Sequence, residues 1–121
     1  IDEYINWIVE IQLPSGGVAT RDITWGDTVY PGTENAASIS QVILALVANG
    51  YDPATGDFVE TDTNMVLRLL EFQLEDGSFD WDLTDEILND PAFSTPQAFL
   101  ALASYYQFMN SNGMDTNPFI K

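Results

Sequence analysis

The chain lacks two residue types that carry much of protein chemistry: none of its 121 residues is a cysteine or a histidine. Without cysteine there is no disulfide and no thiolate metal site. Without histidine the chain has neither the commonest catalytic base nor the commonest transition-metal ligand. Metal centres with thiolate or imidazole ligands are therefore excluded.

Basic residues are also few. Three basic residues, Arg21, Arg68 and Lys121, oppose 19 acidic ones, so the formal net charge is -16 at pH 7. Phosphate binding needs a Lys/Arg footprint, so we expect no nucleic-acid partner, and an anionic membrane surface is improbable for the same reason. No apolar run is long enough to span a bilayer, so no membrane insertion is expected. The acidity indicates either solubility and mutual repulsion or cation binding.

Apolar residues at helical spacing predict four helices, at about residues 1–13, 34–48, 64–74 and 94–110. The last is the strongest, with Thr95 as its cap and Pro96 at its first helical position. It is apolar nearly all round, which predicts an inner helix buried on most sides. Residues 14–32 and 79–93 are predicted to be loops rich in aromatic and acidic side chains. Because Ile1 already lies within the helical pattern, we expect a fragment of a longer protein.

Two pairs of segments indicate an internal repeat. Residues 12–16 and 73–77 share the pattern Gln-Leu-x-x-Gly, and residues 41–46 match residues 97–102. The chain is therefore predicted to be one domain over 1–121, with a first repeat at about 1–57 and a second at about 61–113. The repeated glutamines, Gln12, Gln41, Gln73 and Gln97, are predicted to satisfy backbone groups at helix ends rather than to carry chemistry.

These segments resemble the prenyltransferase and squalene-cyclase-type repeat, the unit of α/α toroids. In that family a helix ends in a Gln-x-x-(Asp)-Gly turn and an Ala/Leu-rich helix follows, as in residues 73–79 and, less well, 12–17. Residues 45–53 and 95–106 are most similar to repeat modules of secreted Gram-positive surface proteins, which are in turn similar to cobalamin carriers. The resemblance implies an all-α fold of antiparallel helical hairpins, a partial α/α toroid built from two repeats.

The catalytic residues of that family do not match. A class II cyclase needs Asp-x-Asp-Asp, whereas residues 80–83 read Asp-Trp-Asp-Leu, and a protein prenyltransferase needs a zinc site with Cys and His. We therefore expect a non-catalytic binding or structural module of a secreted or cell-surface bacterial protein. Two alternatives stay open. One is a fragment of a toroid enzyme, terpene-cyclase-like or glycosidase-like, and the other is a cobalamin-type small-molecule carrier.

Aromatic and acidic loop residues are the candidate ligand-binding residues, for a protein or a carbohydrate ligand: Trp25, Asp27, Tyr30, Asp80, Trp81 and Asp82. The competing interpretation is that these aromatics seal the ends of the helix stack. Asp80, Asp82, Asp85 and Glu86 also provide carboxylates for acid/base chemistry, although a solvated acidic loop is the favoured interpretation.

Calcium is the one cofactor that the sequence suggests. The candidate ligands are Asp76, Asp80 and Asp82, with a second set at Asp52, Thr55, Asp57 and Glu60. Neither set has the spacing of an EF-hand loop, and carboxylates in loops commonly form turns and caps instead. An apolar face left open on so short an array would favour self-association.

Overall fold

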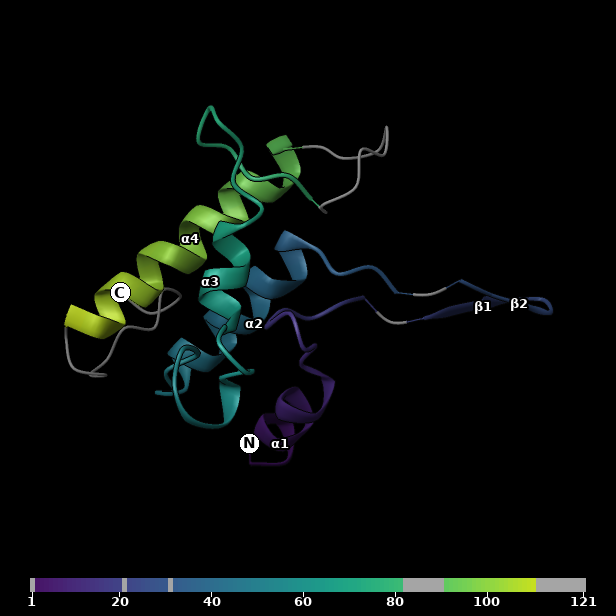
Figure 1. Cartoon of the computed structure of the whole chain (residues 1–121), viewed down its shortest axis with the longest axis horizontal. Coiled ribbons are helices and arrows are strands. Elements are labelled where there is room, and N and C mark those ends of the chain that lie inside the picture. The colour runs from purple at the N-terminus through teal and green to yellow at the C-terminus, as the bar shows by residue number, and fades with distance from the viewer. Residues whose placement is uncertain (1, 21, 31, 82–90, 111–121) are drawn as a thin grey trace.

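The computed structural model describes residues 2–20, 22–30, 32–81 and 91–110, apart from the side chains of Asp2, Ile23 and Tyr30. Its elements, in chain order, are α1 (Asp2–Ile11), β1 (Ile23–Trp25), β2 (Thr28–Tyr30), α2 (Ala36–Ala48), the 3-10 turn η1 (Gly56–Phe58), α3 (Met65–Leu70) and α4 (Pro91–Asn110). The helices gather into one body, from which the β1–β2 hairpin extends to one side (Figure 1).

Helix α2 is the centre of this body. It carries no charged residue, and most of its side chains are buried. Helices α3 and α4 lie against it, and α2 and α4 run in the same direction (Figure 1). Ala98 and Ala101 of α4 are fully buried. Their small side chains let α4 approach α2 closely. The largest fully buried side chains include Phe72, Phe79, Ile39, Ile43, Leu46, Met65 and Leu69.

Two helices begin at asparagine caps. The Asn35 Oδ1 atom accepts a hydrogen bond from the Ser38 N–H at 2.8 Å, and the Asn64 Oδ1 atom accepts one from the Leu67 N–H at 3.0 Å. Each side chain satisfies one of the backbone donors that the first helical turn leaves free. The predicted second helix is thereby confirmed in its position, whereas the third is shorter than predicted and ends at Leu70.

The prediction of an all-α fold, a partial toroid of helical hairpins, was wrong. The segment interpreted as an irregular loop contains an antiparallel two-stranded sheet, in which Trp25 pairs with Thr28 and Thr24 pairs with Val29. Gly26 has φ +63 at the first central position of the two-residue turn, where that conformation needs glycine. Alternating aromatic and β-branched residues on both sides of Gly-Asp are a hairpin signal that the helical interpretation overlooked.

The predictions for the last helix also need correction. Helix α4 begins at Pro91, so Pro96 lies inside it. The Thr95 Oγ1 atom does not act as the predicted cap but accepts a hydrogen bond from the Phe79 N–H at 2.8 Å. Nor is α4 buried on most sides, since Tyr106 is 70% exposed and Phe99 54%. The inner helix is α2, and α4 covers one side of it.

Among the described residues, no helix combines the length and the hydropathy needed to cross a bilayer. This agrees with the prediction of no membrane insertion.

Candidate functional site

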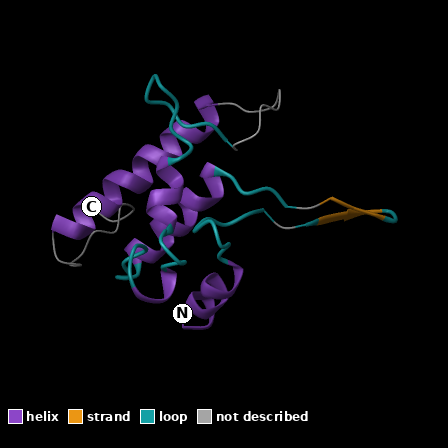
Figure 2. Ribbon diagram, viewed as in Figure 1, coloured by secondary structure: helices purple, strands orange, loops and turns teal. Residues whose placement is uncertain are grey.

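The β1–β2 hairpin is the most prominent feature outside the helical body (Figure 2). Its base is held by backbone contacts, since Ala19 and Glu34 form an antiparallel bridge and the Thr20 N–H donates to the Thr33 oxygen at 3.0 Å. The Thr33 N–H donates in return to the Thr20 Oγ1 atom at 2.8 Å. Beyond this base the two strands project as an arm, which we call the hairpin arm (residues 22–30 and 32–33).

The tip of the hairpin arm exposes one large aromatic ring beside small polar groups. Trp25 is 77% exposed, so its ring does not seal a helix end. Asp27 and Thr28 are exposed as well. Val29 is also exposed, and by the strand register it lies on the opposite face from Trp25. An aromatic face next to a carboxylate and a hydroxyl can stack on a ligand and hydrogen-bond to it.

Glu34, at the base of the hairpin arm, is held by an ion pair. The Arg68 Nη2 and Nε atoms donate to the two Glu34 carboxylate oxygens at 2.6 and 2.9 Å, and the Ser15 Oγ atom donates to the Oε2 atom at 2.5 Å. Burial by itself raises the pKa of Glu34. The hydrogen bonds from Arg68 and Ser15, together with the charge of Arg68, outweigh that effect and hold the pKa below its ordinary value. The pair therefore fixes the arm to α3.

The two Gln-Leu-x-x-Gly segments have the same local structure. In the first, the Gln12 Nε2 atom donates to the Gly16 oxygen at 2.9 Å, and in the second the Gln73 Nε2 atom donates to the Gly77 oxygen at 3.2 Å. Gly16 and Gly77 have φ values of +96 and +92. These glutamines therefore bond to backbone carbonyls, as the sequence predicted. Gln12 also reaches the Phe58 oxygen at 2.7 Å, which ties the first turn to η1.

The other repeated glutamines meet each other. The Gln41 Nε2 atom donates to the Gln97 Oε1 atom at 3.0 Å, across the contact between α2 and α4. Beside this pair Trp7 lines an open groove of about 310 Å³ between α1 and α2. Sequence reasoning assigned this groove no role, since Trp7 was interpreted as part of an apolar helix face.

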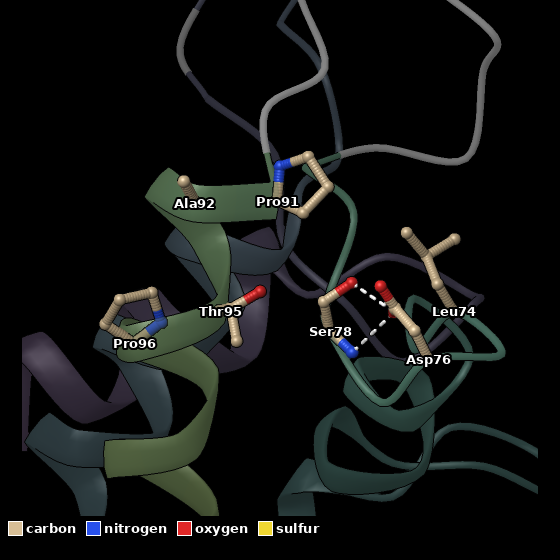
Figure 3. Close-up of a pocket in the computed structure, with 7 residues that line it drawn as sticks. All are labelled: Leu74, Asp76, Ser78, Pro91, Ala92, Thr95 and Pro96. Carbon is tan, nitrogen blue, oxygen red and sulfur yellow. Dashed lines mark hydrogen bonds between the residues drawn. The ribbon is translucent and has the colours of Figure 1, made fainter.

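In the described part of the acidic loop after α3, Asp76 and Asp80 accept hydrogen bonds from residues close in sequence. The Asp76 Oδ1 atom accepts hydrogen bonds from the Ser78 Oγ and N–H at 2.6 and 3.0 Å, and these hydrogen bonds lower the pKa of Asp76. Asp76 and Ser78 form one wall of a hollow of about 440 Å³, with Pro91 and Thr95 of α4 on the other side (Figure 3). The Asp80 Oδ1 atom accepts from the Trp81 N–H at 3.1 Å.

The predicted ligand-binding residues fall into two places. Trp25 and Asp27 lie on the hairpin arm, whereas Asp80 and Trp81 follow α3, where the Ala36 N–H at the start of α2 donates to the Trp81 oxygen at 2.7 Å. Only the backbone of Tyr30 is described, in β2. Three further residues of these predictions lie outside the described residues: Asp82, Asp85 and Glu86.

The calcium sites stay predictions. Among the described residues, no group of three or more acidic side chains is arranged to hold a metal ion. Asp76 and Asp80 are described, but Asp82, the third residue of that set, is not. In the second set, the Asp52 Oδ1 atom accepts a hydrogen bond from the Ala54 N–H at 2.9 Å, which is a turn contact of the kind that loop carboxylates commonly make.

Comparison of the chain with protein-family models, with curated protein sequences and with solved structures finds no match. The resemblance of the Gln-Leu-x-x-Gly segments to the prenyltransferase and squalene-cyclase-type repeat therefore stays a prediction.

Proposed function

We propose that the chain is a non-catalytic binding module of a secreted or cell-surface bacterial protein, and that its hairpin arm binds a neutral carbohydrate. The observation that carries the proposal is the 77% exposure of Trp25 at the tip of an arm that projects from the helical body. The bacterial surface setting is supported by the likeness of residues 45–53 and 95–106 to repeat modules of Gram-positive surface proteins.

The Trp25 ring is distinguished by its place at the tip of the hairpin arm together with its exposure. A fully buried aromatic side chain removes roughly 150–250 Å² from water, yet Trp25 contributes little of its surface to the core. Tryptophan is also among the residues that most often dominate binding energy where a partner covers them. A ring held out on an arm, away from the core that stabilises the fold, is suited to contact with a ligand.

Carbohydrate is favoured by the chemistry of the tip. The ring of Trp25 offers a flat apolar face for the C–H side of a sugar, and Asp27 and Thr28 offer a carboxylate and a hydroxyl for its hydroxyl groups. A net charge of -16 repels anionic polymers and so favours neutral glycans over acidic ones.

Replacing Trp25 with Ala is expected to abolish binding on an array of neutral and acidic glycans while changing the free energy of unfolding by less than about 0.5 kcal/mol. The matched control is Tyr4→Ala, which removes an aromatic ring of similar exposure, 73%, from α1. The control variant should bind as the unmodified chain does.

Three results would contradict the proposal. Binding that survives in Trp25→Ala would place the ligand elsewhere. A marked loss of stability in Trp25→Ala would mean that the ring packs. A chain that binds no glycan on the array at any concentration would exclude carbohydrate as the ligand.

A further inference from the structure

Helix α4 carries an exposed seam along the side that faces away from α2. Its members recur in alternating steps of four and three residues and are all exposed: Ala92, Pro96, Phe99, Ala103, Tyr106 and Asn110. This is the spacing with which one helix packs along another. Phe99 is already held in position by edge-to-face contact with Phe79, at 5.8 Å between ring centroids. We call these six residues the α4 seam.

We propose that the α4 seam is the contact through which two copies of this chain form an antiparallel dimer. Large and small side chains alternate along the seam, so the contact can be self-complementary, as a two-fold interface requires. In an antiparallel pair Phe99 of one copy lies opposite Ala103 of the other. In the same register Tyr106 lies opposite Pro96, and Asn110 lies opposite Ala92.

The charge distribution also favours a second copy. The 20 residues of α4 include no Asp, Glu, Lys or Arg, although the chain as a whole has a net charge of -16. Contact between the two α4 helices themselves would therefore bring no pair of carboxylates together. The remaining repulsion between the two copies acts at longer range and is screened by salt, so the dimer should be tighter at high ionic strength.

The apolar area that α4 exposes is enough for a weak dimer. Phe99 and Tyr106 of the seam are 54% and 70% exposed, and Phe93 on its flank is 57% exposed. The three rings together expose roughly 350 Å² of aromatic surface. With Leu100 and Met109, which also flank the seam, the patch reaches roughly 500 Å² per copy, at the upper end for the surface of a monomer. Two copies would bury about 1,000 Å², the lower limit for a specific interface, so we expect a dissociation constant in the micromolar range.

Sedimentation equilibrium over a wide range of concentration at high salt tests the dimer. We expect a mass that rises with concentration from one chain to two and no further. Ala103→Glu, which introduces a charge at the centre of the seam, should weaken association at least about tenfold. Ala45→Glu is the matched control, because Ala45 is an exposed alanine on α2, and it should leave association unchanged. Circular dichroism establishes that both variants fold.

Cysteine cross-linking tests the antiparallel direction, since the chain has no cysteine of its own. Mixing Ala92→Cys with Asn110→Cys should give the mixed disulfide. Asn110→Cys alone should not, because the two copies of that position lie roughly 27 Å apart along the helix axis. The proposal is overturned by a mass of one chain at every concentration, by growth beyond two chains, by equal effects of the two glutamate variants, or by ready cross-linking of Asn110→Cys with itself.

Discussion

Replacing Gly16 with Ala is expected to lower the free energy of unfolding by about 3 kcal/mol. Gly16 has φ +96, a conformation that side chains rarely adopt. An added Cβ would also come within 2.7 Å of the Asn64 backbone oxygen. Asn64 caps α3, and its oxygen accepts the hydrogen bond of the Arg68 N–H at 2.9 Å. Relieving the clash would therefore displace the start of α3.

The matched control is Gly77→Ala, the same change at the equivalent position of the second turn. Gly77 has φ +92, but none of the described residues lies within 4 Å of where its Cβ would stand. This variant should cost about 1 kcal/mol, the conformational penalty alone. Urea unfolding of both variants measures the difference. Equal costs would mean that the first turn does not press against α3, contrary to the packing described above.

The second large effect is expected at the ion pair that holds the hairpin arm to α3. Arg68→Met should lower the free energy of unfolding by about 2 kcal/mol, because it leaves the Glu34 carboxylate partly buried without its cation. The side chains of Arg68 and Glu34 are only 18% and 17% exposed. Glu71→Gln, which removes the more exposed partner of Arg68, should cost about 0.5 kcal/mol or less.

A double variant measures the interaction between Arg68 and Glu34 separately from the contribution of each side chain alone. Combining Arg68→Met with Glu34→Gln should cost less than the sum of the two single changes, because the neutral amide no longer needs a cation. Chemical denaturation of the four proteins provides the comparison. Additive costs would show that the two side chains act independently, which their 2.6 Å contact does not allow.

Lowering the pH should weaken the ion pair between Arg68 and Glu34. The pKa of Glu34 is lowered in the folded chain from an ordinary value of 4.5, so the folded state binds this proton less tightly than the unfolded state. The stabilisation is thus fully present above that ordinary value and is lost as the pH falls through the lower folded pKa. The difference in stability between the unmodified chain and Glu34→Gln should shrink over this range. A difference that stays constant with pH would contradict the assignment.

The helices could be predicted from the sequence where one strong local signal determined them. The uncharged run ending in Asn-Gly located α2, and the repeated Gln-Leu-x-x-Gly pattern located both turns. The predicted role of Gln12 and Gln73 was correct, since both amides donate to the carbonyl of the glycine four residues on. Gln12 is buried, and a buried amide beside a turn has few partners other than backbone carbonyls. Gln73 makes the same contact from an exposed position.

The sequence could not distinguish an inner helix from a covering one. Helices α2 and α4 are both uncharged and apolar nearly all round, so periodicity alone does not determine which has neighbours on several sides. Likewise, Thr95 before Pro96 is a good local cap, but tertiary contact with Phe79 gave that hydroxyl another partner. The hairpin was missed for a different reason: its Gly-Asp turn was present in the sequence, but the helical resemblance obscured it.

The candidate binding residues were predicted only as a composition of aromatic and acidic loops. Sequence reasoning grouped Trp25 with Trp81, whereas the structure places Trp25 on the hairpin arm and Trp81 beside the start of α2. Which loop residues share a surface depends on how the loops pack, and no local pattern encodes it.

Binding of a ligand by the hairpin arm can be measured directly, because the chain has three tryptophans and only Trp25 lies on the arm. The indole N–H resonances of Trp7, Trp25 and Trp81 are followed by NMR during titration with a soluble neutral oligosaccharide that the array identifies. We expect the Trp25 resonance to shift progressively to saturation while the Trp7 and Trp81 resonances stay in place. A shift of the Trp7 or Trp81 resonance with an unchanged Trp25 resonance would place the ligand on the helical body and contradict binding by the hairpin arm.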